Sequence, residues 1–383
     1  MACFGGEGNV AERAAVLQHP VNGAVRDVCL CSGMGGNMHC RLCRSKTIRT
    51  AQYALDAYGE RVSKEQNNRA RPPSFFGGNS LTAFRLLFWG GHMFHGAITA
   101  LVTPFRNGVI DEEAFRAHIE WQLEQGIHAL LPCGTTGESA TMTHEEHENA
   151  IRICIEQVKG RVPVLAGAGS NNTAEAIRLT AFAKKAGADA ALLISPYYNK
   201  PTQEGIFRHF KAVNDAVAMP LFVYNVPGRT GSNILPATMA RLFRELEHVI
   251  GVKEATGNLV QVSNMLEQCG PDFLLFSGDD FTLLPSLSLG ACGVISVTSN
   301  IAPAKMAALC EAWEKGDAAL ARRLHFELEP LNRAMFVESN PIPVKTSLSL
   351  MGRMTDEFRL PLCNMAPAAQ DALRAELARA GLL

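Results

Sequence analysis

Residues 177–195 read IRLTAFAKKAGADAALLIS and contain, in one stretch, the two kinds of element from which the later chain is built. Ile177 and Ala181 lie on a helical repeat that ends at Gly187, a residue type that commonly closes helices. The run Ala190–Ser195 is apolar enough to be a strand buried on both faces, as strands of parallel sheets are. A helix that passes through a glycine into a buried strand is typical of an α/β fold.

Seven more runs of this buried type lie along the chain from Met93 onward, and helical segments separate them. Alternation of buried strands with helices is typical of a parallel sheet. Eight strand–helix units in roughly 220 residues favour a closed barrel over an open doubly wound sheet. The sequence therefore predicts a (β/α)8 TIM barrel. Its strands are expected within residues 97–102, 129–132, 162–166, 190–195, 221–226, 250–254, 273–277 and 293–297.

Capping residues mark the bounds of two helices in this pattern. Asp111 precedes an apolar helical repeat and is a suitable N-cap, and Gly126 closes the same helix. Thr143 and Glu146 have the spacing of a capping box, in which each side chain bonds to the backbone of the other residue. We therefore expect helices that begin just after Asp111 and just after Thr143.

The chain divides into three parts by composition. Residues 1–92 are rich in arginine and glycine without sustained periodicity, and we expect a disordered or mis-called extension there. Residues 93–316 hold the units of the catalytic barrel, and residues 317–383 have a helical pattern that predicts a small C-terminal helical domain. An alternative interpretation of residues 1–92 is that they contain a metal knuckle. Its ligands would be Cys29, Cys31, His39, Cys40 and Cys43.

Composition and charge exclude several classes of protein. The chain has 36 Lys and Arg against 37 Asp and Glu, for a formal net charge of −1. This balance gives no basic field for nucleic acid or a membrane surface, so we expect a small-molecule partner. Of eleven cysteines, those after residue 100 stand singly in apolar stretches, which predicts buried free thiols in a reducing compartment. No signal-peptide pattern is present, and we expect a cytoplasmic protein.

Lys253 is the strongest candidate for a chemical role. It lies in Ile250-Gly251-Val252-Lys253-Glu254-Ala255-Thr256, inside an otherwise apolar strand. Loss of hydration lowers the pKa of a lysine and frees the amine as a nucleophile. The alternative, an ion pair with Glu254, is disfavoured because adjacent strand residues point to opposite faces.

Two loops that follow predicted strands carry groups suited to binding carboxylates. Gly134-Thr135-Thr136-Gly137-Glu138-Ser139 offers backbone N–H groups and two hydroxyls, which makes it a candidate anion site. Tyr224-Asn225-Val226-Pro227-Gly228-Arg229-Thr230 places a phenol at a strand end and a guanidinium just beyond it. The phenol can transfer protons and the guanidinium can bind a second carboxylate. Taken alone, Tyr224 is explained equally well by packing, and Arg229 is by default a surface charge.

Two more pairs of residues stand out by composition and spacing. Tyr197 and Tyr198 are adjacent in a chain with only five tyrosines, which indicates a site or an interface. His144 and His147 share a helix face and could bind a metal with Glu138 or Glu175. No cysteine or further histidine lies at ligand spacing, so we expect no metal.

Taken together, these motifs resemble the dihydrodipicolinate synthase (4-hydroxy-tetrahydrodipicolinate synthase) family, within the pyruvate-dependent Schiff-base aldolases that include N-acetylneuraminate lyase. The resemblance extends from Met93 to Leu383. It rests on Gly-Val-Lys-Glu-Ala-Thr around Lys253, on Pro-Gly-Arg-Thr around Arg229 and on Asn-Pro-Ile-Pro-Val-Lys from Asn340. It rests also on Gly-Thr-Thr-Gly-Glu-Ser from Gly134, of which residues 134–138 are named the threonine loop. It implies a (β/α)8 barrel with a three-helix C-terminal domain, and a lyase that condenses pyruvate with L-aspartate 4-semialdehyde on the route to lysine and diaminopimelate.

The resemblance also assigns roles to individual residues. Lys253 would form the Schiff base, and Thr135 and Thr136 would bind the pyruvate carboxylate. Thr135, Tyr224 and Tyr198 would form a proton relay, with Tyr198 reaching into a neighbouring subunit of a homotetramer made of two dimers. Arg229 would bind the carboxylate of the semialdehyde, and Gly278 and Ile295 would line the pyruvate site. The imine nitrogen is the electron sink of this chemistry, so we expect no cofactor.

The resemblance also implies a regulatory site for lysine. Members of this family differ in whether lysine inhibits them. Its residues here would be Ser139, Ala140, His144, His147, Asn171, Glu175 and Tyr197. Two alternatives to the synthase stay open. One is a related pyruvate lyase that acts on a sugar acid or a hydroxyproline-derived keto acid, against which Arg229 and the paired tyrosines argue. The other is a ligand-sensing barrel without catalysis, against which an intact Lys253, Tyr224 and Thr135 argue.

Overall fold

The computed structural model describes residues 93–383, and in them eight parallel strands form one sheet. The order of neighbours is β4-β1-β10-β9-β8-β7-β6-β5, and a bridge between Leu130 and Val164 joins the two end strands. The sheet is therefore a closed barrel, as the sequence predicts. The strands are β1 (Gly96–Ala100), β4 (Ala129–Leu131), β5 (Leu165–Gly167), β6 (Ala190–Ile194), β7 (Leu221–Asn225), β8 (Val249–Glu254), β9 (Leu274–Ser277) and β10 (Gly293–Ser296).

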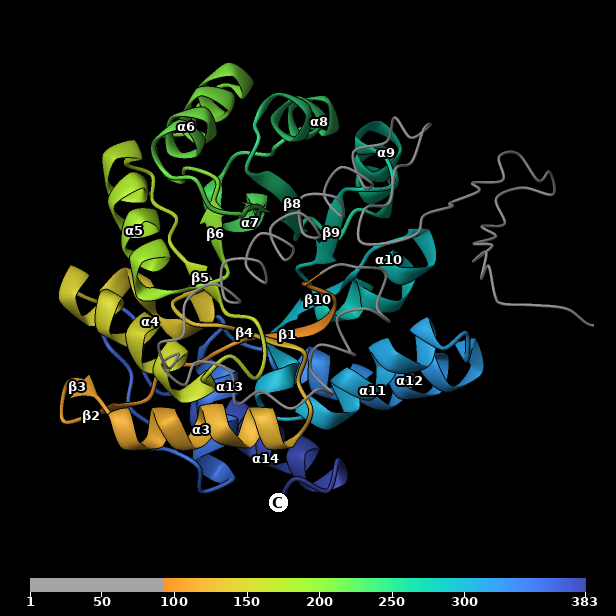
Figure 1. Ribbon diagram of the computed structural model, residues 1–383. Helices are drawn as coiled ribbons and strands as arrows, with labels where there is room; N and C mark the ends of the chain where they lie inside the picture. The colour runs from red at the N-terminus through yellow and green to blue at the C-terminus, as the bar shows by residue number, and fades with distance from the viewer. Residues whose placement is uncertain (1–92) are drawn as a thin grey trace, which may run out of the picture. The chain divides into compact units, whose positions relative to one another are not determined.

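Helices separate the strands and surround the barrel (Figure 1). They are α3 (Glu112–Glu124), α4 (His144–Val158), α5 (Thr173–Ala186), α6 (Gln203–Ala216), α7 (Pro227–Thr230), α8 (Pro236–Glu245), α9 (Leu259–Cys269), α10 (Leu283–Leu289) and α11 (Pro303–Glu314). After the barrel come α12 (Ala318–Ala334), α13 (Ile342–Leu350) and α14 (Pro367–Arg379). The expected C-terminal helices are therefore present. None of the helices in the described part is long and apolar enough to cross a membrane.

The predicted caps form as the sequence indicates. The Asp111 side chain accepts a hydrogen bond from the Ala114 N–H at the start of α3. Thr143 and Glu146 make both bonds of the capping box at the start of α4. Gly187 ends α5 with φ of 97°, a left-handed conformation that favours glycine. These caps fix where the helices begin and end relative to the strands.

The strand predicted at residues 162–166 lies later in the structure, in β5. Pro163 has no N–H to donate to a sheet ladder, although its carbonyl accepts a hydrogen bond from the Leu130 N–H at 3.1 Å. Val164 forms only an isolated bridge, and regular pairing with β6 begins at Leu165. The prediction therefore placed the start of this strand too early.

Apolar side chains fill both the barrel and the space between barrel and helices. Inside the barrel, residues such as Phe222, Phe276 and Ile295 are buried completely. The Phe222 ring contacts Phe94 and Phe276 edge-on, at centroid distances of 5.4 and 5.7 Å. This packed interior leaves the ends of the strands and the loops after them as the place for polar groups.

The cysteines of the described part are free thiols. Cys133, Cys154 and Cys310 are buried, as predicted, while Cys269 and Cys292 are half-buried. Cys363 is exposed, so the prediction of a buried thiol is wrong there, because the segment that joins α13 to α14 lies at the surface. The cysteine and histidine pairs considered for a zinc knuckle lie outside the described residues.

Candidate active site

Tyr224 and Lys253 lie side by side at the carboxyl ends of β7 and β8, respectively. The two strands pair so that Tyr224 is opposite Lys253. The ammonium Nζ of Lys253 lies 4.5 Å from the centroid of the Tyr224 ring. Both side chains are buried, with 6 % of Lys253 and 8 % of Tyr224 exposed. An amine and a phenol are thus held together at the end of the barrel where enzymes of this fold place their chemistry.

Burial controls the ionisation of both groups. Loss of hydration lowers the pKa of the Lys253 amine to about 8, with the nearby carboxylates of Asp279 and Asp280 opposing the change and Arg229 adding to it. Burial raises the pKa of the Tyr224 phenol to about 12, while the Arg229 charge and a hydrogen bond with Thr135 oppose the rise. At neutral pH the phenol therefore keeps its proton, and a useful fraction of the lysine is free amine.

The residues that follow Tyr224 and Lys253 point away from them and bind each other behind the strands. The Glu254 carboxylate accepts hydrogen bonds from the Asn225 side chain at 2.9 Å, from the Gln261 side chain at 3.3 Å and from the Thr256 N–H at 2.9 Å. Glu254 is thereby satisfied without Lys253. This arrangement fixes the ends of β7 and β8 relative to each other, and it matches the alternation of side chains along a strand.

The threonine loop follows β4 and begins with a short 3₁₀ turn, Thr135–Gly137. Thr136 is buried, and its hydroxyl oxygen accepts a hydrogen bond at 3.0 Å from the side-chain amide of Asn340. Thr135 is bound to the phenol of Tyr224. The loop is therefore tied to the Tyr224 phenol on one side and to the C-terminal helices on the other.

Asn340 also contacts Arg229, which lies in the last turn of α7. The guanidinium Nη2 of Arg229 donates a hydrogen bond of 3.1 Å to the Asn340 carbonyl. The side-chain Oδ1 of Asn340 is buried and has no hydrogen-bond partner among the described residues. Asn340 is thus the link between the two candidate carboxylate sites. Sequence reasoning noted its motif and gave it no role.

The ends of β9 and β10 complete the site. A Cβ atom at Gly278 would lie 2.4 Å from the Cβ of Ala255, so only glycine fits there. Ile295 of β10 is fully buried within the barrel. Burial raises the pKa of the Asp279 carboxyl to about 6 against the opposing charge of Lys253. Asp280 accepts hydrogen bonds from the N–H groups of Val297 and Thr298 at 3.0 and 3.2 Å. Sequence reasoning missed both acids.

The candidate regulatory residues come from neighbouring elements. His144 Nε2 and Glu175 Oε1 are 2.6 Å apart, and Ser170 also binds Glu175. The side-chain amide of Asn171 donates to the Tyr197 carbonyl at 3.1 Å. His147 is buried, and its burial lowers the pKa of the imidazole to about 4.

The other two predicted positions, Ser139 and Ala140, lie in the 3₁₀ turn Ser139–Thr141, just after the threonine loop. Within residues 93–383, no cluster of His, Cys, Asp and Glu has an arrangement that could hold a metal ion. Tyr198 stands apart from the rest of the site. Its side chain is 89 % exposed and its backbone has φ of 68°.

A closed parallel barrel with a buried lysine of lowered pKa beside a buried tyrosine defines the chain as a barrel lyase of the aldolase type. The model of the dihydrodipicolinate synthetase family matches residues 93–380. The chain belongs to this family.

Relatives of known name agree with this assignment. The 4-hydroxy-tetrahydrodipicolinate synthase of Nitratidesulfovibrio vulgaris strain DP4 is 68% identical over 290 residues, which cover 76% of this chain and 99% of the relative. A dihydrodipicolinate synthase from Acinetobacter baumannii, solved in complex with pyruvate, is 42% identical with a TM-score of 0.74 and covers 76% of this chain and 99% of its own. The enzyme from Cyanidioschyzon merolae, solved with lysine bound, is 41% identical with a TM-score of 0.74 and covers 76% and 100%.

Proposed function

We propose that this chain is a 4-hydroxy-tetrahydrodipicolinate synthase that condenses pyruvate with L-aspartate 4-semialdehyde through Lys253. The observation that carries the proposal is the buried Lys253 amine, 4.5 Å from the centroid of the Tyr224 ring. This chain covers 99% of a relative of that name, at 68% identity. The free thiols of the described part agree with a cytoplasmic location, which is part of the proposal.

The first half of the reaction forms a nucleophile from pyruvate. The free amine of Lys253 attacks the ketone carbon, and loss of water gives an imine. Tyr224 gives a proton to the departing oxygen and recovers one from Thr135, to which it is bound. Loss of a proton from the methyl carbon of the imine then gives an enamine. Thr135 and Thr136 bind the pyruvate carboxylate throughout, and Gly278 and Ile295 border the same site.

The second half joins the two substrates. The enamine carbon attacks the aldehyde carbon of the semialdehyde, and the aldehyde oxygen takes a proton through Tyr224. The amino group of the semialdehyde next attacks the imine carbon, closes the ring and releases Lys253 as the free amine. Arg229 binds the carboxylate of the semialdehyde. Its contact with Asn340 supports this role, because the same asparagine binds Thr136 and so fixes the spacing between the two carboxylates.

Mass spectrometry after treatment with pyruvate and borohydride tests the function, together with a coupled assay using aspartate semialdehyde. We expect a reduced pyruvyl adduct on Lys253 and turnover of both substrates. An adduct without turnover would indicate a related pyruvate lyase instead. No adduct would overturn the mechanism, and a Lys253→Met variant gives the baseline for the measurement.

Tyr198 is proposed to act in the site of a neighbouring subunit within a homotetramer, a role that its 89 % exposure in a single chain supports. Co-expression of Tyr198→Phe with Lys253→Met tests this directly. Each variant alone has a defect in every site, but a mixed dimer would contain one site with both native residues. Recovery of activity in the mixed protein is the expected result, and mixed protein no more active than its parents would contradict the role.

Lysine is proposed to bind as an inhibitor beside α4 and α5. The carboxylate of Glu175, bound to His144 and Ser170, is placed to receive an ammonium group, and burial keeps His147 neutral at physiological pH. Isothermal titration with lysine is the test. We expect binding that Glu175→Gln weakens at least tenfold, and titration of the native protein without heat would remove this part of the proposal.

A further inference from the structure

Glu138 and Lys345 form an ion pair that is completely buried. The Nζ of Lys345 lies 2.5 Å from Oε1 of Glu138, and both side chains are 0 % exposed. Lys345 also donates to the Glu357 carbonyl at 2.7 Å and lies 4.5 Å from the centroid of the Phe105 ring. The two residues are 207 positions apart in sequence, so the pair joins the start of the barrel to α13.

Glu138 is the residue on which the threonine loop ends. Its N–H donates to the Thr135 carbonyl at 3.1 Å, which closes the short turn that carries both threonines. Its backbone is left-handed, with φ of 56° and ψ of 32°, a conformation that residues other than glycine seldom adopt. Such a conformation persists where surrounding contacts determine it, and the bond to Lys345 is such a contact.

A second tie runs in parallel with the first. Asn340 binds Thr136, while Lys345 binds Glu138 two residues further along the same loop. Asn340 lies two residues before α13, and Lys345 lies in the first turn of α13. Two contacts from this short stretch to one turn fix both the position of the turn and its rotation.

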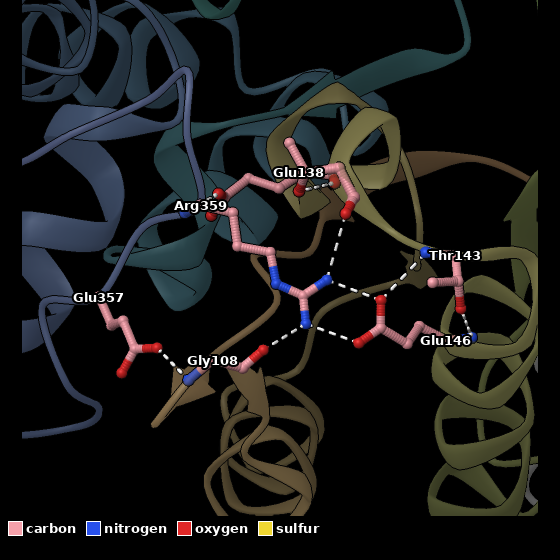
Figure 2. Close-up of polar contacts among 7 residues, drawn as sticks. Gly108, Glu138, Thr143, Glu146, Glu357 and Arg359 are labelled. Atoms are coloured by element: carbon pink, nitrogen blue, oxygen red, sulfur yellow. Dashed lines mark hydrogen bonds and ion pairs between the residues drawn. The ribbon is translucent and has the colours of Figure 1, made fainter.

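Further bonds surround Glu138 (Figure 2). The Arg359 guanidinium binds both oxygens of Glu146, at 2.7 and 2.6 Å, and the Gly108 carbonyl at 2.7 Å, and the Arg359 N–H donates to Glu138 at 3.3 Å. Glu357 accepts the Gly108 N–H at 2.6 Å. The segment after α13 is thereby bound to the start of α4 and to the hairpin before α3, which consists of β2 (Phe105–Arg106) and β3 (Val109–Ile110).

A buried ion pair is a poor source of stability, because desolvation of both charges offsets their attraction. Well-packed apolar side chains would serve stability equally well. Its advantage is geometric, since each buried charge must be satisfied by hydrogen bonds and so holds its partners in fixed positions. The placement of this pair, at the end of a loop proposed to bind a carboxylate, gives that precision a use.

We propose that the Glu138–Lys345 pair positions Thr135 and Thr136 for the carboxylate of pyruvate, so that α13 belongs to the substrate site. The proposal rests on the proposed function of the threonine loop. Glu138 and Lys345 touch no substrate and act as positioning residues. Because the threonines bind a group that does not react, their displacement weakens binding of pyruvate more than it slows later steps.

Steady-state kinetics of three variants test the proposal. Lys345→Met removes the ammonium at similar size, Glu138→Gln with Lys345→Met removes both charges, and Glu138→Asp keeps both charges but withdraws the carboxylate by one methylene. We expect kcat/KM for pyruvate to fall at least tenfold. We expect kcat/KM for aspartate semialdehyde to fall by a smaller factor, because the pyruvate carboxylate depends on both threonines, whereas the later step involves them only through the bond between Thr135 and Tyr224.

The control is Arg161→Met, which breaks a bidentate ion pair with Glu120 on the outside of the barrel. Its kcat/KM for pyruvate should equal that of the native enzyme. A loss of folded protein would lower the rate with both substrates by the same factor, so the selective loss separates positioning from general damage. A native kcat/KM for pyruvate in any folded variant of the pair would overturn the proposal.

Hydrogen exchange of the native enzyme gives a measurement that needs no variant. Binding of pyruvate should slow exchange at residues 342–346 as well as at residues 135–138, and protection confined to the loop would also overturn the proposal. Failure of the proposed function itself gives a different result, namely no borohydride-trapped pyruvate on Lys253 in the native chain.

Discussion

Replacement of Gly278 by alanine should lower the catalytic rate, because the added methyl group would overlap atoms of the two residues that follow Lys253. The added Cβ would lie 2.4 Å from the Ala255 Cβ, 3.0 Å from its Cα and 3.1 Å from the Glu254 carbonyl oxygen. Carbon atoms in ordinary contact lie about 3.5–4.0 Å apart, so the ends of β8 and β9 must separate by about 1 Å. The neighbours are backbone atoms and a Cβ, which cannot rotate aside.

The separation would reach Lys253 directly. The Gly278 N–H donates to the Glu254 carbonyl at 2.7 Å, and Lys253 pairs with Phe276 in the same ladder. A misplacement of about 1 Å at a reacting group can cost roughly 100-fold in rate. We therefore expect kcat/KM for pyruvate to fall about 100-fold in Gly278→Ala, and the rate of borohydride trapping at Lys253 to fall with it.

Gly228→Ala is the matched control for this substitution. Gly228 also lies beside a proposed substrate-binding residue, Arg229, but a Cβ there would meet nothing within 4 Å. Its kcat/KM should stay within about twofold of the native value. Thermal unfolding of both variants checks that each is folded. If folded Gly278→Ala traps pyruvate at the native rate, the argument that only glycine fits beside Lys253 is refuted.

Three further outcomes follow from the site and its caps. The pKa of Lys253 is lowered to about 8, so the fraction of free amine should rise about tenfold per pH unit below pH 8 and level off above it. The rate of pyruvate trapping should follow the same curve, and a rate independent of pH between 6 and 8 would contradict this. Arg229→Met should raise KM for aspartate semialdehyde at least tenfold while the pyruvate adduct forms normally, and equal losses with both substrates would count against its role. Thr143→Ala removes the N-cap bond of α4 and should lower the free energy of unfolding by about 1 kcal/mol in urea titrations, with no change expected from Ser288→Ala at the surface.

The barrel could be predicted because its signals are local. Each strand is a short apolar run, and capping residues such as Asp111, Thr143 and Gly187 act on their own helices. The hairpin of β2 (Phe105–Arg106) and β3 (Val109–Ile110) was missed although Asn107-Gly108, a strong turn signal, lies between its strands. Its strands are two residues long, too short for an alternating pattern to show.

The groups in the site were only partly predictable for a related reason. Lys253 stands out as a charge in an apolar strand, and Tyr224 ends the neighbouring strand. Asn340 gives no such signal, because its partners Thr136 and Arg229 are 204 and 111 positions away in sequence. Sequence periodicity describes what a residue does within its own element, whereas these contacts depend on how the C-terminal helices pack on the barrel.

The contacts of Asn340 and Lys345 bear on why a barrel of this kind continues into further helices. The strands place the amine, the phenol and two carboxyl groups at one end, but the loops proposed to bind the substrate carboxylates need support from outside the sheet. Here α13 and the residues just before it supply this support, through Asn340 to Thr136 and Arg229 and through Lys345 to Glu138. Since Asn340 binds both loops, a change in its position would alter the distance between them, and with it the distance between the two carboxylates that they are proposed to bind. The C-terminal helices are in this sense a part of the active site that the barrel lacks.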